Sequence, residues 1–93
     1  MVVLVLTIEL YASWVHSLKE KRMEVKSLLS RLQNKFNISA SEVAEQDTHQ
    51  TIVIGIAAIA ANAAQADSIC ERILQFVENT TDAQMVHVQR ELR

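Results

Sequence analysis

The spacing of apolar and polar side chains changes along the chain, and each spacing predicts a type of element. Apolar side chains alternate in residues 2–11, which is typical of a strand with one buried face. Residues 18–36 instead carry an apolar stripe with the helical period of 3.6 residues. Residues 51–60 predict another strand, and a second helix follows over about 63–78. Alternation returns in residues 84–91 and predicts the last strand.

A weaker strand is predicted over residues 38–46, between the first helix and the strand at 51–60. Ile38 and Ala40 alternate there, but Val43 is out of phase with them. An extra residue in one strand changes which face the following side chains occupy. A bulge near Ser41–Glu42 would therefore return Val43 to the buried face.

The predicted order of elements is β-α-β-β-α-β, and it spans residues 1–93 as a single domain. Two right-handed crossovers convert this order into a four-stranded antiparallel sheet with both helices on one face. We therefore expect a ferredoxin-like α+β fold with one modest core, as suits a chain of 93 residues.

The starts of both predicted helices carry capping residues. Ser17 followed by Glu20 is the pattern of a capping box, and Asn62 is the expected cap of the second helix. Trp14 and His16 lie in the connection just before Ser17. Trp14 is expected to close the core over the helix start, although it is also placed where it could contact a partner.

Charge is unevenly distributed along the chain, whose net charge is −2. Residues 17–36 hold six basic and two acidic side chains, whereas the remainder holds three basic and nine acidic ones. A basic helix on an acidic body points to phosphate or RNA contact, and a solvated helix face is the structural alternative. The candidate contact residues share one flank of this helix or its preceding loop: Trp14, His16, Lys19, Arg22 and Lys26.

The sheet face turned away from the helices is also predicted to be apolar, which would leave it exposed in a monomer. Such a patch is usually covered by a second copy or a partner. It offers no aromatic side chain on residues 51–60, so base stacking of the RNA-recognition type is not expected there. The candidate self-association residues are Val3, Val5, Val53, Ile59 and Met85.

Several other kinds of chemistry are not indicated by the residues. The single cysteine, Cys70, falls on the apolar face of the second helix, and one cysteine fits a reducing cytoplasm. The three histidines lack metal-ligand spacing, so we expect no metal and no cofactor. Each apolar run is shorter than the roughly 20 residues of a spanning helix, so no membrane partner is expected. An enzyme working through His16 and Glu42 is a less favoured alternative.

Three segments together resemble a known family. The most specific is HSLKEKR at 16–22, directly after the first strand, and SASEVAEQD at 39–47 and IVIGIAAIA at 52–60 continue the likeness. With these segments the chain resembles, end to end, the YlxP-like family of small bacterial proteins. The family often carries a tryptophan after the turn aspartate, whereas Thr48 follows Asp47 here.

The resemblance implies a ferredoxin-like fold without a recognised catalytic motif. It also implies an association with ribosomes or RNA, because genes of the family are found beside those of translation and ribosome-maturation factors. We therefore expect a non-enzymatic cytoplasmic factor that contacts a ribosomal subunit or rRNA. The alternative is a dimeric small-ligand-binding or regulatory module that assembles through the open sheet face.

Overall fold

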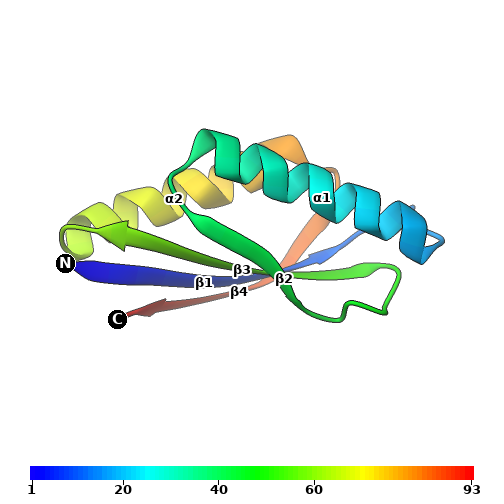
Figure 1. Ribbon diagram of the computed structural model, residues 1–93, viewed down its shortest axis with the longest axis horizontal. Helices are drawn as coiled ribbons and strands as arrows, with labels where there is room; N and C mark the ends of the chain where they lie inside the picture. Colours follow the sequence, from blue (N-terminus) through cyan, green and yellow to red (C-terminus); the bar gives the residue numbers. More distant parts are fainter.

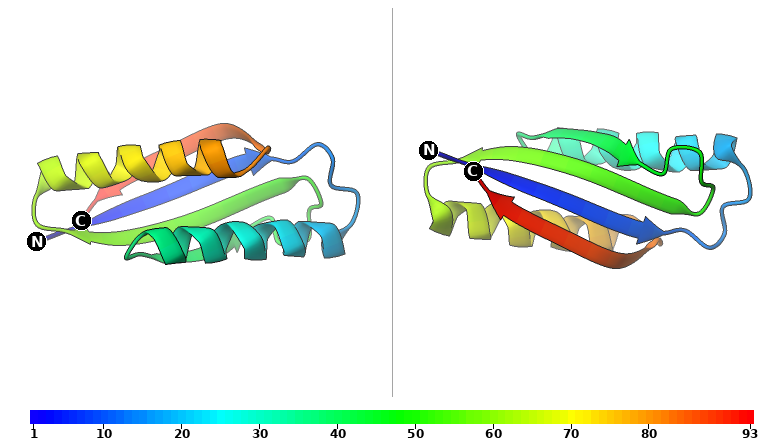
Figure 2. Two further views of the ribbon diagram at one scale, coloured as in Figure 1. Left: turned by 90° about the horizontal axis from the view of Figure 1, so that it is seen from above. Right: turned by 90° about the horizontal axis from the view of Figure 1, so that it is seen from below.

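The computed structural model describes residues 1–93 and contains the four strands and two helices in the predicted order. Both helices cover one face of a single antiparallel sheet with strand order β2-β3-β1-β4, which confirms the ferredoxin-like α+β fold (Figure 1; Figure 2). The elements are β1 (Val2–Tyr11), α1 (Leu18–Lys35), β2 (Ser39–Ala44), β3 (Thr51–Ala60), α2 (Ala63–Thr80) and β4 (Gln84–Leu92).

The core lies between the sheet and the two helices. Strand β1 pairs with β3 along its whole length, and its alternating side chains Leu4, Leu6, Ile8 and Leu10 are buried under the helices. Helix α2 contributes Cys70, as its position on the apolar stripe predicted. Burial, followed by the negative charge of Glu71, raises the pKa of the Cys70 thiol. Neither helix combines the length and the apolar character that crossing a membrane requires.

Strand β2 departs from the prediction in the position of its bulge. Its register with β3 shifts between Glu42 and Ala44, so the bulge falls at Val43 rather than at Ser41–Glu42. Val43 therefore lies on the open sheet face, where it is 52% exposed, and the expectation that it returns to the core is wrong. The Val43 side chain covers Gly55, and it can do so because glycine has no side chain. A Cβ at position 55 would lie only 2.7 Å from Val43 Cγ1.

A second bulge corrects the prediction for Met85. The register of β1 with β4 shifts between Glu9 and Leu10, which leaves Val86 as the extra residue of β4. The extra residue reverses the alternation on either side of it. Met85 consequently pairs with Leu10 and packs against the core, so it does not belong to the open sheet face.

The remaining predicted residues of the open sheet face differ in exposure. Val3 and Val5 are half-buried on this face, and Ile59 is 67% exposed. Val53 lies on the same face but is only 8% exposed, because it sits between Glu9 of β1 and the bulged end of β2. The prediction that Val53 is exposed is therefore wrong.

Both helices begin at the predicted caps. The Ser17 hydroxyl accepts a hydrogen bond from the Glu20 N–H at 3.1 Å, although the reciprocal bond of a full capping box is not formed. The Asn62 side chain accepts from the Gln65 N–H at 2.9 Å, and Gln65 in turn accepts from the Ala61 N–H.

Replacing Ser17 by alanine removes the only side-chain acceptor at the start of α1 and should lower the free energy of unfolding by about 0.5–2 kcal/mol. Ser27→Ala, at an exposed position within the same helix, is the matched control and should change stability by less than about 0.5 kcal/mol. Urea denaturation of the two variants measures the difference. Equal midpoints would show that Ser17 does not act as the cap.

Candidate functional site

Lys21 is the only charged residue buried in this protein, with 1% of its surface exposed. Its ammonium group donates a hydrogen bond to the backbone oxygen of Glu45. It also lies 2.9 Å from Glu42 Oε2, without the angle of a hydrogen bond, so this second contact is a charge pair. Lys21 lies one turn into α1, and it therefore ties the start of the helix to β2 and to the β2–β3 turn.

The turn that receives Lys21 has its own supporting contacts. Glu45 is the only non-glycine residue with a positive φ, at 56°, a conformation that costs about 1–2 kcal/mol for an ordinary side chain. Its backbone oxygen also accepts from the Thr48 N–H at 3.1 Å, and its carboxylate accepts from the Thr48 hydroxyl at 2.8 Å. These contacts hold the turn in its strained conformation and place an acceptor against Lys21.

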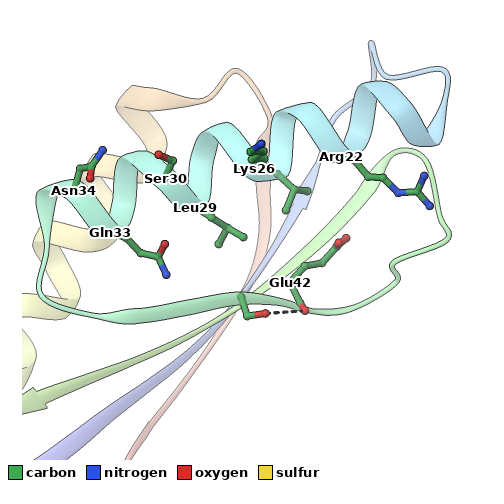
Figure 3. Close-up of a pocket in the computed structure, with 9 residues that line it drawn as sticks. Arg22, Lys26, Leu29, Ser30, Gln33, Asn34 and Glu42 are labelled. Carbon is green, nitrogen blue, oxygen red and sulfur yellow. Dashed lines mark hydrogen bonds between the residues drawn. The ribbon is translucent and has the colours of Figure 1, made fainter.

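A groove of about 510 Å³ runs between α1 and β2, beside this ion pair (Figure 3). In the close-up, Arg22 lies at one end of the groove and Asn34 at the other, while Leu29 and Gln33 point from α1 toward β2. The groove has cationic, apolar and amide-bearing portions in that order along the helix. Its lining comprises Arg22, Val25, Lys26, Leu29, Ser30, Gln33, Asn34, Ser41 and Glu42.

The cationic portion of the groove carries uncompensated charge. Arg22 and Lys26 are exposed, and neither has a carboxylate within 4.0 Å. Glu42 is the only carboxylate that lines the groove, and it is paired with Lys21. Because this pair cancels the negative charge of Glu42, the groove attracts anions at its Arg22–Lys26 end.

The predicted contact residues lie at different sites on the surface of the protein. Arg22 and Lys26 line the groove, whereas Lys19 is exposed one turn before them on α1. Trp14 lies outside the groove, in a hollow between α1 and the end of α2. His16 is exposed in the β1–α1 connection and makes no side-chain hydrogen bond. The structure therefore does not bring Trp14 and the groove cations into one site.

The pair of Lys21 and Glu42 was not predicted from the sequence, although the spacing of both residues indicates it. Lys21 continues the spacing of the buried stripe, four residues before Val25. Glu42 continues the alternation of Ile38 and Ala40 on the face of β2 that is turned toward the helices. Two opposite charges at core-facing positions of neighbouring elements indicate a buried ion pair.

Comparison with known proteins places this ferredoxin-like domain in a family. Residues 3–90 match the family model described as "Protein of unknown function (DUF503)". The chain is also similar to "Uncharacterized protein YlxP" of Bacillus subtilis (strain 168), with 46% identity over 63 residues and 68% of each chain covered. The chain belongs to this family, which confirms the YlxP-like resemblance.

Lys21→Met should destabilise the fold, because it keeps the aliphatic volume but leaves Glu42 beside the core without a counter-charge. Breaking a fully buried ion pair costs about 3–5 kcal/mol. Glu42 is 17% exposed, so we expect a smaller loss of about 2–3 kcal/mol from Lys21→Met. Chemical denaturation of the wild type and of this variant measures the loss in free energy of unfolding.

The matched control is Lys35→Met, at an exposed position in the last turn of the same helix. It should change stability by less than about 0.5 kcal/mol. Adding Glu42→Gln to Lys21→Met should recover part of the loss, because it removes the unpaired charge. Equal stability of Lys21→Met and Lys35→Met would contradict a structural role for the pair.

Proposed function

We propose that this protein is a non-enzymatic cytoplasmic factor of translation or ribosome maturation, which binds rRNA on a ribosomal subunit through one flank of α1. The basic flank consists of Lys19, Arg22 and Lys26. The observation that carries the proposal is that all three side chains are exposed and that none has a carboxylate within 4.0 Å. The resemblance to the YlxP-like family implies the same association with ribosomes or RNA.

The spacing within the basic flank suits a phosphate backbone. From Lys19 to Lys26 the helix rises about 10 Å, so three long side chains can reach neighbouring phosphates of one strand. Arginine adds a bidentate fork that matches phosphate geometry. Lys21 supports this surface by neutralising Glu42, which would otherwise repel phosphate beside Arg22.

Replacing Lys19, Arg22 and Lys26 together by glutamine should abolish most of the salt-dependent binding to ribosomal subunits. Three phosphate contacts predict a slope of log affinity against log salt of about −2 to −3 for the wild type, and a slope near zero for the variant. Co-sedimentation with purified subunits between about 50 and 300 mM salt, a range over which screening changes appreciably, measures both slopes.

The matched control replaces Arg31, Lys35 and Arg72 by glutamine, which removes the same charge away from the basic flank. This control should keep the wild-type slope. If both triple variants lose binding equally, net charge and not the basic flank governs the interaction. If neither loses binding, the flank is only a solvated helix face and the proposed function is wrong.

A second candidate function is a dimeric small-ligand-binding or regulatory module. The observation that favours it is the apolar open sheet face, where Val43 is 52% and Ile59 67% exposed beside Val3 and Val5. Exposed apolar patches of this kind are usually covered by another protein surface. A second copy of this chain would cover it with the same residues.

Sedimentation equilibrium at micromolar concentration tests the second candidate. The wild type should sediment as a dimer, and the double variant Val43→Lys with Ile59→Lys as a monomer, because two buried charges would oppose association. Met23→Lys, at an exposed apolar position on α1, is the control and should leave the dimer intact. A monomeric wild type would contradict this candidate.

A further inference from the structure

The groove between α1 and β2 has the volume of a small-ligand site. Its volume of about 510 Å³ lies within the roughly 300–1,000 Å³ of such sites. Val25 and Leu29 provide an apolar floor between its cationic and amide-bearing portions. A base that is paired within a duplex is not free to enter the groove, although the phosphates of the duplex could still reach the basic flank from outside.

The cationic portion of the groove suits a phosphate group. Arg22 and Lys26 are four residues apart and therefore neighbours on the helix surface. Their charge is uncompensated because Lys21 neutralises Glu42. An arginine fork beside a lysine ammonium offers charge-assisted hydrogen bonds to a single phosphate.

The opposite portion of the groove offers both donors and acceptors. Gln33 carries an amide that points toward β2, whereas Ser30 and Asn34 lie at the rim of the groove with their side chains turned away from β2 (Figure 3). The Ser41 hydroxyl donates to the Glu42 carbonyl at 3.3 Å. The Gln33 Nε2 donates to the Ala40 carbonyl of β2 at 3.2 Å, which leaves its Oε1 free to accept. Such donors and acceptors can form hydrogen bonds with the edge of an unpaired base, and the apolar floor can contact its face.

The same Gln33 contact disfavours a peptide strand as the occupant. Strand β2 is an edge strand, and a peptide could extend the sheet only by pairing with its free backbone groups. The Gln33 amide already occupies the Ala40 carbonyl. A side chain that covers an edge in this way obstructs strand addition.

We infer that the α1–β2 groove holds one unpaired nucleotide of a single-stranded RNA segment. Its phosphate contacts Arg22 and Lys26, and its base lies over Leu29 toward Gln33. The inference rests on the proposed function and makes it more specific, because the protein then prefers single-stranded RNA to duplex RNA.

Ser30→Phe tests the groove without changing charge. Ser30 is exposed at the rim of the groove on α1, and phenylalanine at this position would narrow the groove at its rim while leaving the basic flank intact. The probe is a fluorescent single-stranded RNA of about 12 nucleotides, compared with the duplex it forms with its complement. The variant should bind the single strand roughly tenfold more weakly, as for the lost contacts of one base while the phosphate contacts remain, and the duplex as the wild type does.

The matched control is Ser68→Phe, which places the same side chain at an exposed serine of α2. It should bind both RNAs as the wild type does. If Ser30→Phe also leaves single-strand affinity unchanged, the inference is wrong while the proposed function stands. If the triple glutamine variant of the basic flank binds both RNAs as the wild type does, the proposed function falls and the inference with it.

An NMR titration of the wild-type protein with adenosine monophosphate gives a readout that is independent of any variant. Amide shifts should concentrate at Arg22, Lys26 and Gln33. Shifts at Val5 and Gly55 instead would place the ligand on the open sheet face and overturn the inference. Displacement of the nucleotide from the groove by an equal concentration of a short polyglutamate peptide would identify the occupant as an acidic peptide and also overturn it.

Discussion

The ion pair between Lys21 and Glu42 is the constraint on which the position of α1 on the sheet depends. Apolar packing alone would let α1 slide along the sheet, because hydrophobic contact has little directional preference. Lys21 fixes the position, since its ammonium must meet both the Glu42 carboxylate and the Glu45 carbonyl. The bulge at Val43 and the positive φ of Glu45 bring these two acceptors to the same place.

This constraint also sorts the basic side chains of α1 by role. Lys21 belongs to the interior, whereas Arg22 and Lys26 remain exposed and without carboxylate partners. Because the pair neutralises the one carboxylate in the groove, a structural interaction sets the sign of the charge on a neighbouring surface. The open sheet face lies on the other side of the sheet, so the two candidate surfaces do not compete. An RNA bound along α1 would leave Val43 and Ile59 free to contact another protein.

The sequence predicted the elements of the fold because their spacing follows from burial. The helices end within two residues of the prediction, and β1 and β3 agree with it. The bulge predicted near Ser41–Glu42 lies at Val43, and the bulge at Val86 was not predicted, since a bulge depends on the partner strand and not on local periodicity. They account for the wrong placements of Val43 and Met85. Arg22 and Lys26 were predicted as a basic flank, but the groove beside them depends on how α1 sits over β2, which no single segment encodes.

The central claim is that the ammonium group of Lys21 is held inside the folded protein between Glu42 and Glu45. Nitrogen-detected NMR of the lysine ammonium groups tests it directly, because exposed ammonium protons exchange rapidly with water and buried hydrogen-bonded ones do not. Of the four lysines, we predict one slowly exchanging ammonium signal at neutral pH, which is assigned to Lys21 by its loss in Lys21→Met. Rapid exchange of all four ammonium groups would contradict the account.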